Sequence, residues 1–380
     1  MDSPPWPARD TRTGVSTNPI PIRCFTTTFA SNPHFTTANM PTTQPPSPAL
    51  AIAVAGLGRM GKRHVSTLIE RVPRARVVAV CSTSADELAW AEENYRNAGI
   101  KIYDSYEAMI QHPGLQAVWM STSTNVHAAQ TQAAIERGLH VLCEKPLSAD
   151  MEKAAHVVTV TNAHPEFKVM AGFFRRFDAS YRDAKAKIEA NTIGTPFLVR
   201  SQTCDLLDHT GFFVRYAKLN GGMFVDCCIH DIDLSLWFLG PNVIPKAVWA
   251  AGTIRHDPEL ASLNDVDNGV GIVEYWGGKL AYLYCSRTQA HGHDVCTEVV
   301  DTAGKIMPEY WERFEEAFAT EAKEFVAAVL DHRPVPVALE TGLMSLKIGW
   351  ALQEALLTGE RIRFDEEGNK LGGEGAKARL

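Results

Sequence analysis

Two stretches of this sequence carry side chains that could transfer a proton or stabilise a developing negative charge. Residues 143–146 read Cys-Glu-Lys-Pro and place Glu144 and Lys145 directly after an expected strand. Asp226 and His230 fall in an expected helix, where a separation of four residues puts the carboxylate within reach of the imidazole. Such a carboxylate fixes the tautomer of the ring and raises its proton affinity. Taken singly, the stretches also fit a surface Glu-Lys pair and a hydrogen-bonded core histidine.

The helix expected over residues 222–239 has an apolar face and a polar face beside it. Its apolar residues recur at helical spacing, which predicts a buried stripe. The buried stripe comprises Val225, Ile229, Ile232, Leu236 and Leu239. The stripe beside it comprises Asp226, His230, Asp233 and Trp237.

A glycine-rich turn near the start of the fold predicts what lies beside these side chains. Residues 51–55 are small or branched apolar residues, typical of a strand buried on both faces, and an amphipathic helix is expected over 60–72. Between them, Gly56, Gly58 and Gly61 form a G-x-G-x-x-G sequence, in which glycines permit a tight turn and close approach of backbone N–H groups to a pyrophosphate. The helix N-terminus then faces the anion, which predicts a dinucleotide site. The expected contacts are Gly56, Leu57, Gly58, Arg59, Met60 and Gly61.

Strands and helices alternate over residues 50–173, which predicts an α/β Rossmann domain with a parallel, doubly wound sheet. Ligands of such sheets bind at the carboxyl ends of the strands, which is where Lys145 falls. The expected strands cover residues 50–55, 77–81, 101–103, 117–121, 140–144 and 168–173. The expected helices cover residues 60–72, 85–97, 105–111, 125–138 and 149–163.

The pattern changes after residue 173, and residues 174–360 predict an α+β domain with an open, mainly antiparallel sheet. Helices on one face would leave the other face uncovered, so we expect a homo-oligomer, either a dimer or a tetramer. A charged tail is expected over 361–380. The expected strands cover residues 197–204, 246–254, 269–276, 280–287 and 297–300. The expected helices cover residues 178–191, 222–239, 309–331 and 341–358.

The end of the second expected strand bears on the choice between NAD and NADP. An acidic residue at that point normally binds the ribose hydroxyls of NAD, but here the chain reads Ser82-Thr83-Ser84 and no acid appears before Asp86. The hydroxyls of these residues could bind a 2′-phosphate, although no Arg or Lys lies nearby to neutralise it. We therefore leave NAD and NADP open, favour NADP, and assign Ser82 and Thr83 to the cofactor site.

Composition excludes several classes of protein. The 380 residues carry a formal net charge of -7, which gives no reason to expect nucleic acid or an anionic membrane as a partner. No apolar run approaches the length of a transmembrane helix. Eight cysteines are too dilute for a disulfide framework, so we expect reduced thiols and a cytoplasmic protein.

Residues 1–49 hold 10 of the 21 prolines and few acids, so we expect a disordered tail. Arg9, Arg12 and Arg23 leave a mitochondrial presequence as the alternative localisation, but no basic helical face accompanies them. Met40 is an alternative first residue, which leaves open whether residues 1–39 belong to the mature protein.

One short group of residues resembles a set of metal ligands. The group comprises His291, His293, Asp294 and Cys296. It lies between expected strands and lacks a structured second pair of ligands, so a solvated loop is the simpler interpretation. The pair of Asp226 and His230 has no evident third ligand. We therefore expect no metal site.

Several motifs in order make the chain similar to one known family. They are Gly-Leu-Gly-Arg-Met-Gly at 56–61, Ser-Thr-Ser-Thr-Asn-Val-His at 121–127, Glu-Lys-Pro at 144–146, Gly-Phe-Phe-Arg-Arg-Phe-Asp at 172–178, and the glycine pair at 221–222 leading to Asp226 and His230. Over residues 50 to 360 the chain resembles the Gfo/Idh/MocA oxidoreductases, and within them the inositol 2-dehydrogenase branch.

The resemblance implies an NAD(P)-dependent dehydrogenase that acts on a secondary hydroxyl of a cyclitol or sugar. His230 would then take the hydroxyl proton, Asp226 would orient His230, and Lys145 would hydrogen-bond the oxygen as alkoxide character develops. Asp226 and His230 would also contact the substrate. Two alternatives stay open on the same scaffold: a non-catalytic regulator that senses a dinucleotide, and an NADPH-dependent carbonyl reductase.

The resemblance also implies further contacts with both ligands. Glu144 would touch the nicotinamide ribose, beside Lys145, and Arg175 would face the hydroxyls of the substrate. The cofactor cleft would be lined by Thr122, Asn125 and His127. The chain departs from the family in two further places: a proline common near Ser123 is missing, and residues 304–306 run almost directly into 308–314, where relatives have additional strand residues. This gap leaves open whether the second sheet is complete, and with it the oligomer interface.

Overall fold

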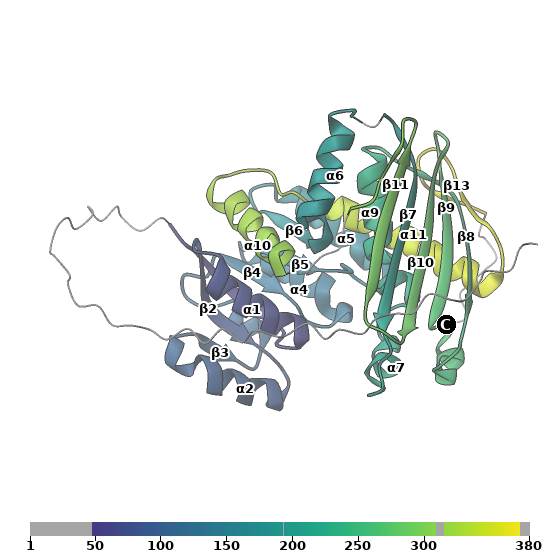
Figure 1. Ribbon diagram of the computed structural model, residues 1–380. Helices are drawn as coiled ribbons and strands as arrows, with labels where there is room; N and C mark the ends of the chain where they lie inside the picture. The colour runs from purple at the N-terminus through teal and green to yellow at the C-terminus, as the bar shows by residue number, and fades with distance from the viewer. Residues whose placement is uncertain (1–47, 193, 309–314, 373–380) are drawn as a thin grey trace, which may run out of the picture. The chain divides into compact units, whose positions relative to one another are not determined.

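The computed structural model describes residues 48–192, 194–308 and 315–372, and Figure 1 shows their arrangement. Nearly all of the predicted disordered tail lies outside the described residues. The start of the helix expected over 309–331 and the end of the predicted charged tail also lie outside them. Among the described residues, no helix is long and apolar enough to cross a membrane.

The first sheet is a six-stranded parallel sheet, as predicted. Its strands follow the order β3-β2-β1-β4-β5-β6, so the chain crosses over between β3 and β4 as in a doubly wound fold. Every residue of β1 is buried, because helices cover both faces of the sheet. The strands are β1 Leu50–Ala55, β2 Ala75–Cys81, β3 Lys101–Tyr103, β4 Ala117–Met120, β5 His140–Glu144 and β6 Val169–Gly172.

The helices of this part connect successive strands. α4 packs against α5, whereas α1 packs against α10, a helix from the far end of the chain (Figure 1). The connecting helices are α1 Arg59–Arg71, α2 Ala85–Tyr95, α3 Tyr106–Met109, α4 Thr124–Glu136 and α5 Met151–Ala163. The sequence assigns α10, Glu315–Leu330, to the second domain, but Ala322, Phe325 and Val326 of this helix belong to the apolar core of the first sheet.

The second sheet has eight strands in the order β12-β11-β7-β10-β9-β8-β13-β14. All neighbouring pairs are antiparallel except β7 with β10, which confirms the predicted mainly antiparallel sheet. The edge strand β12 is two residues long. The strands are β7 Pro196–Leu206, β8 Pro245–Thr253, β9 Asn268–Tyr275, β10 Lys279–Gln289, β11 Asp294–Asp301, β12 Lys305–Ile306, β13 Ile362–Phe364 and β14 Lys370–Leu371.

Two of these strands lie where the sequence predicts only a charged tail. In β13, Ile362 and Phe364 are buried and Arg363 between them is exposed, so the strand pairs with β8 and turns both apolar side chains into the core. The alternation is only three residues long, too short to identify a strand from its pattern. The tail prediction is therefore wrong for residues 362–364 and 370–371.

Helices cover one face of the second sheet. α9 packs against β7, and α11 packs against β8, α8 and α9. The opposite face presents large apolar side chains that are 37 to 42% exposed: Trp249, Ile272, Leu280 and Tyr282. The helices are α6 Ala179–Glu189, α7 Phe212–Ala217, α8 Met223–Asp226, α9 Ile229–Leu239 and α11 Leu339–Thr358, with short 3-10 turns at Arg96–Ala98, Phe174–Phe177 and Pro258–Leu263.

Candidate active site

The three glycines of the turn after β1 differ in what surrounds them. Gly56 has a φ of +84°, and a Cβ there would lie 2.5 Å from the carbonyl oxygen of Ser121. A Cβ on Gly61 would lie 1.8 Å from the carbonyl oxygen of Gly56. At Gly58, by contrast, the nearest atom to an added Cβ is a carboxylate oxygen of Glu87 at 3.7 Å. Two glycines are thus required by the protein's own packing, whereas Gly58 leaves space in front of the backbone.

The N-terminus of α1 can accept an anion. Gly58 is its N-cap residue, no side chain caps it, and its first turn contains no acidic residue. The positive end of the helix dipole is therefore not neutralised by the chain. These features fit the pyrophosphate of a dinucleotide. Arg59 is exposed beside this turn, whereas Leu57 is fully buried and anchors it.

The loop after β4 is tied to the loop after β5 through His127. The imidazole Nδ1 lies 2.8 Å from the Pro146 carbonyl oxygen, and Nε2 lies 3.0 Å from that of Thr122. Burial lowers the pKa of His127 despite these two carbonyls. His127 therefore holds two loops at the carboxyl edge of the sheet, and Asn125 beside it is exposed. Direct contact of Thr122, Asn125 and His127 with a cofactor stays a prediction.

Glu144 turns inward from the end of β5. It is 8% exposed, and its carboxylate lies 2.7 Å from Nε2 of the buried His64. Burial opposes the negative charge, but the hydrogen bond and charge of His64 outweigh it, so the pKa of Glu144 is lowered. The carboxylate also accepts a hydrogen bond of 3.2 Å from the backbone N–H of Lys145. Contact of Glu144 with the nicotinamide ribose stays a prediction.

Lys145 and Asp226 meet at the carboxyl edge of the first sheet. The Lys145 ammonium donates to Oδ1 of Asp226 at 3.1 Å and to the Asp226 carbonyl oxygen at 2.8 Å. The other carboxylate oxygen, Oδ2, accepts from Arg287 at 2.6 Å and from Asn220 at 3.3 Å. We call Lys145, Asn220, Asp226 and Arg287 the site cluster. Its members come from three separate segments of the chain: the end of β5, residues 220–226 and β10.

The backbone before Asp226 sets the direction of its side chain. Gly221 and Gly222 have φ values of +83° and +95°, a region that favours glycine, and α8 starts directly after them. The side chain of Asn220 accepts from the Gly222 N–H at 2.9 Å, and Asp265 accepts from the Met223 N–H at 2.8 Å. The start of this short helix is therefore fixed by side-chain acceptors.

The helix expected over 222–239 is interrupted between α8 and α9. The N–H groups of Cys227 and Cys228 both donate to the Met223 carbonyl oxygen at 3.0 Å, so one turn contains an additional residue. This wider turn shifts Asp226 out of the i, i+4 relation with His230. Among the described residues, the Asp226 carboxylate bonds to Lys145, Arg287 and Asn220 and not to His230. The expected direct pair of Asp226 and His230 is therefore not formed.

His230 nevertheless lies near the same edge. Its ring contacts Phe173 and Phe174, with centroid distances of 6.1 and 5.0 Å. Phe173 follows β6 directly, and β6 pairs with β5 so that Gly172 is opposite Glu144. The imidazole is 7% exposed. The buried stripe beside it is as predicted: Val225, Ile229, Ile232, Leu236 and Leu239 are all buried.

The charges of the site cluster stabilise each other. Burial favours the neutral form of Lys145, but the negative charge of Asp226 outweighs it, so the pKa of Lys145 is raised. Burial likewise opposes the charge of Asp226, but Lys145 and Arg287 outweigh it and lower the pKa of Asp226. Lys145 is therefore an ammonium at neutral pH. It can donate a hydrogen bond to a substrate oxygen but cannot act as the base.

Arg175 belongs to a second group of buried charge. Its guanidinium lies 3.3 Å from Asp231, whose oxygens also accept from Ser201 at 2.5 Å and Thr203 at 2.6 Å. We call these residues the core cluster. Arg175 is only 4% exposed, and its predicted contact with substrate hydroxyls stays a prediction. Asp233 of the predicted polar stripe forms a two-bond ion pair with Arg176 at 2.7 and 2.8 Å.

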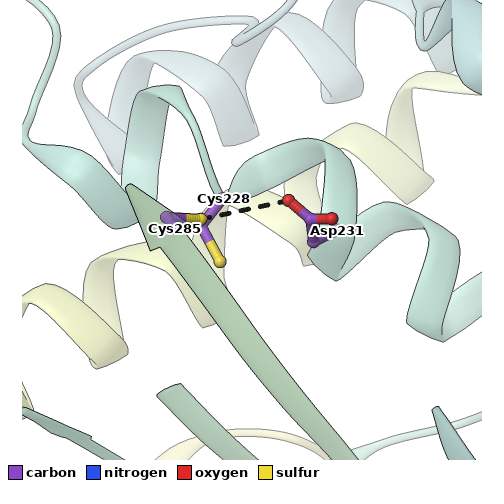
Figure 2. Close-up of side chains that lie close together, drawn as sticks. All are labelled: Cys228, Asp231 and Cys285. Atoms are coloured by element: carbon purple, nitrogen blue, oxygen red, sulfur yellow. Dashed lines mark hydrogen bonds between the residues drawn. The ribbon is translucent and has the colours of Figure 1, made fainter. Parts of the chain in front are cut away.

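One group of potential metal ligands occurs among the described residues: Cys228, Asp231 and Cys285, shown in Figure 2. Burial raises the pKa of both thiols, whereas metal ligation requires thiolates. The Asp231 oxygens already accept from Ser201 and Thr203. This group is therefore a packed part of the core and does not fit a metal. All cysteines of the described residues are free.

The residues considered as a possible zinc site make other contacts. His293 lies 3.1 Å from the carboxylate of Asp205, and Asp294 accepts from Gln202 at 2.7 Å. These contacts tie the start of β11 to β7.

Sequence reasoning missed three residues around Asp226: Arg287, Asn220 and Tyr216. The position of Arg287 could have been predicted from the alternation of residues along its strand. Ala281, Leu283 and Cys285 alternate along β10 and are buried, so a cation at 287 continues the inward face of a strand. Tyr216 of α7 lies in the fields of Asp226 and Lys145, and burial is the largest cause of its raised pKa.

Comparison with known proteins agrees with this fold. Residues 50–173 match an oxidoreductase family with an NAD-binding Rossmann fold, and residues 181–307 match the GFO/IDH/MocA C-terminal domain. The chain therefore belongs to the Gfo/Idh/MocA family of NAD-binding oxidoreductases, and the prediction of a dehydrogenase with this two-part fold is confirmed.

Among its relatives are enzymes of inositol oxidation. The scyllo-inositol 2-dehydrogenase (NAD(+)) of Bacillus subtilis is 31% identical over 341 residues, which cover 82% of this chain and 96% of that protein. The myo-inositol 2-dehydrogenase of Thermotoga maritima is 28% identical over 83% of this chain and 99% of that protein. A crystal structure of scyllo-inositol dehydrogenase from Lactobacillus casei with bound NAD(H) and scyllo-inositol has a TM-score of 0.76 at 31% identity, and the match covers 83% of this chain and 99% of that one.

Proposed function

We propose that this protein oxidises a secondary hydroxyl of a cyclitol of the inositol type to a ketone, with NAD as the hydride acceptor. The observation that carries the proposal is the Lys145 ammonium held 3.1 Å from Asp226 at the carboxyl edge of the NAD-binding sheet. A fixed cation at this edge is placed to hydrogen-bond the oxygen of a bound polyol. The two bacterial relatives described above are inositol 2-dehydrogenases, which supports the substrate class.

The proposed chemistry separates the hydrogen-bond donor from the base. Lys145 donates to the hydroxyl oxygen and stabilises the negative charge that develops there. His230 accepts the hydroxyl proton as general base while the carbon loses its hydride to NAD. Asp226 keeps Lys145 charged and directs the ammonium through two hydrogen bonds from Nζ. In this scheme, Asp226 orients Lys145 and not His230.

Polyhydroxylated substrates suit the polar groups of the site cluster. The cluster offers donors from Lys145, Arg287 and Asn220 around one carboxylate. A cyclitol presents several hydroxyl groups that both donate and accept, so it can exchange hydrogen bonds with such a group without leaving a buried charge unsatisfied.

Initial-rate measurements test the proposal. Wild-type protein is assayed with myo-inositol, scyllo-inositol and common aldoses, each with NAD and with NADP, by following the reduced cofactor. The proposal expects the highest kcat/KM for an inositol with NAD. It is overturned if a wild type that binds NADH oxidises none of the polyols, or if an aldose is preferred to every inositol.

A homo-oligomer stays part of the proposal. The apolar side chains on the uncovered face of the second sheet, such as Trp249 at 42% and Leu280 at 40% exposure, would be buried by a second copy of the chain. Light scattering after gel filtration measures the mass, and Leu280→Glu should shift an oligomer toward the monomer. A monomeric wild type at micromolar concentration would contradict this part.

A further inference from the structure

The loop after β2 is closed by hydrogen bonds within the loop. The Ser82 hydroxyl donates to Oε2 of Glu87 at 2.5 Å and accepts from the Ser84 N–H at 3.0 Å. The Ser84 hydroxyl accepts from the Glu87 N–H at 3.5 Å and caps α2. Two of the three hydroxyls that the sequence offered to a 2′-phosphate are therefore used inside the loop. This finding removes the reason for favouring NADP.

The Glu87 carboxylate lies between the end of β2 and the glycine turn. One oxygen is held by Ser82, the first residue after β2. The other, Oε1, lies 3.7 Å from the position of a Cβ on Gly58, the N-cap residue of α1. An acidic side chain at the end of the second strand, facing the glycine turn, is the element that binds the ribose hydroxyls of NAD. Glu87 puts a carboxylate there from the first turn of α2.

Glu87 has no direct ion-pair partner among the described residues. Its carboxylate accepts its side-chain hydrogen bond from neutral Ser82. Lys62 of α1 contacts the Trp90 ring instead of Glu87: its ammonium lies 4.2 Å from the ring centroid. Asp86, the neighbouring acid in the same helical turn, is exposed and adds negative charge. A phosphate would thus meet a carboxylate that no direct ion pair neutralises.

We propose that Glu87 selects NAD over NADP by accepting hydrogen bonds from the adenosine ribose and repelling a 2′-phosphate. The ribose 2′-hydroxyl donates to Oε1, which Ser82 leaves available, whereas a 2′-phosphate has no proton to donate at neutral pH and carries like charge. The inference rests on the proposed NAD-dependent activity, but it concerns cofactor binding alone and needs no polyol.

Cofactor titrations test the inference without a substrate. NADH and NADPH are titrated by their nicotinamide fluorescence into wild type, Glu87→Gln and the matched control Asp86→Asn. Both variants remove one negative charge from the same helical turn, but only Glu87 faces the glycine turn. Glu87→Gln keeps the shape of the side chain and an oxygen for Ser82, so it should lower the preference for NADH over NADPH by about tenfold or more. Asp86→Asn should leave the preference close to that of wild type.

A second variant separates selectivity from structure. Ser82→Ala removes the donor that holds Glu87 but keeps its charge, so NADH should bind more weakly while NADPH gains nothing. The inference is overturned if wild type binds NADPH as tightly as NADH, or if Glu87→Gln and Asp86→Asn change the preference equally. A protein that prefers NADH through Glu87 but oxidises no polyol would refute the proposed function and leave this inference standing.

Discussion

The site cluster around Asp226 and the core cluster around Asp231 have similar chemistry and different surroundings. Both aspartates are buried, and each faces an arginine: Arg287 at 2.6 Å from Asp226, and Arg175 at 3.3 Å from Asp231. The site cluster adds Lys145, whose side chain is 18% exposed. The core cluster adds neutral donors to Asp231: the hydroxyls of Ser201 and Thr203, and the Cys285 thiol at 4.0 Å.

The difference shows that buried charge alone does not define an active site. Asp231 has a relative exposure of 0%, and its partners come from β7, β10 and the turn after β6. Asp226 faces a lysine at the end of β5, the edge at which such sheets bind ligands. We therefore expect changes in the site cluster to reduce turnover and changes in the core cluster to reduce stability.

Lys145→Ala should reduce turnover more than any other variant proposed here. If it did not, the assignment of the site cluster to catalysis would be wrong. Loss of the ammonium removes the donor to the substrate oxygen, so kcat should fall by about 10³-fold, while thermal unfolding changes little because Asp226 keeps Arg287. Steady-state kinetics with the preferred inositol measure the loss. Lys153→Ala, at an exposed lysine of α5, is the control and should retain activity. Equal activity of both variants would refute the role of Lys145.

Asp231→Asn should give the converse result. The variant leaves the Arg175 guanidinium buried opposite a neutral amide, so the free energy of unfolding should fall by about 3 kcal/mol or more. Urea unfolding followed by circular dichroism measures the change, and kcat of the folded protein should stay near that of wild type. Asp183→Asn, in an exposed pair with Lys187, should cost about 0.5 kcal/mol or less. A large loss of kcat without loss of stability would show that the core cluster belongs to the active site.

Arg287→Met sharpens the comparison through pH. Arg287 and Lys145 together outweigh burial and lower the pKa of Asp226. Without Arg287 that pKa should rise, so activity should be lost at a higher pH as the solution is acidified, and kcat at neutral pH should fall about tenfold. The pH dependence of kcat measures both effects. Arg333→Met, at an exposed arginine, should leave unchanged the pH at which kcat falls on acidification. The prediction is contradicted if that pH is also unchanged in Arg287→Met.

Glu321→Gln tests a third buried carboxyl group, one that forms no ion pair with any described residue. Neither oxygen of Glu321 has a hydrogen-bond partner among the described residues, and burial, with the nearby charge of Glu144, raises its pKa well above the usual range. The folded protein therefore keeps a proton that the unfolded chain releases above about pH 4.3. Stability is full below that pH and declines as pH rises toward the folded pKa.

Glutamine does not ionise, so Glu321→Gln does not lose stability in this way as the pH rises. The variant and the wild type should therefore be equally stable near pH 4, and the variant should be more stable by about 1 kcal/mol or more at pH 7. Thermal unfolding at several pH values measures the difference. Glu324→Gln, on the same helix at 38% side-chain exposure, should show little dependence on pH. An advantage that is constant with pH would contradict the raised pKa of Glu321.

Much of the fold could be predicted because its signals are local. The apolar strand at 50–55 and the glycines at 56, 58 and 61 lie within one short segment, and their packing depends on atoms that the same pattern brings together. The strands β13 and β14 and the docking of α10 on the first sheet could not be predicted, because short or distant segments become ordered only against a surface that the rest of the chain has already formed.

The sequence by itself determined the dinucleotide turn, the parallel sheet, and the presence of a lysine at the ligand edge, since residue type and spacing restrict the backbone directly. Only the tertiary structure decided the partners of Asp226. Among the described residues its carboxylate bonds to Lys145 and not to His230, and Arg287 reaches it from a distant strand. The same holds for Glu87, whose carboxylate reaches the end of β2 from the next helix. Hydrogen bonds between such side chains depend on distances in space, which the order of residues along the chain does not specify.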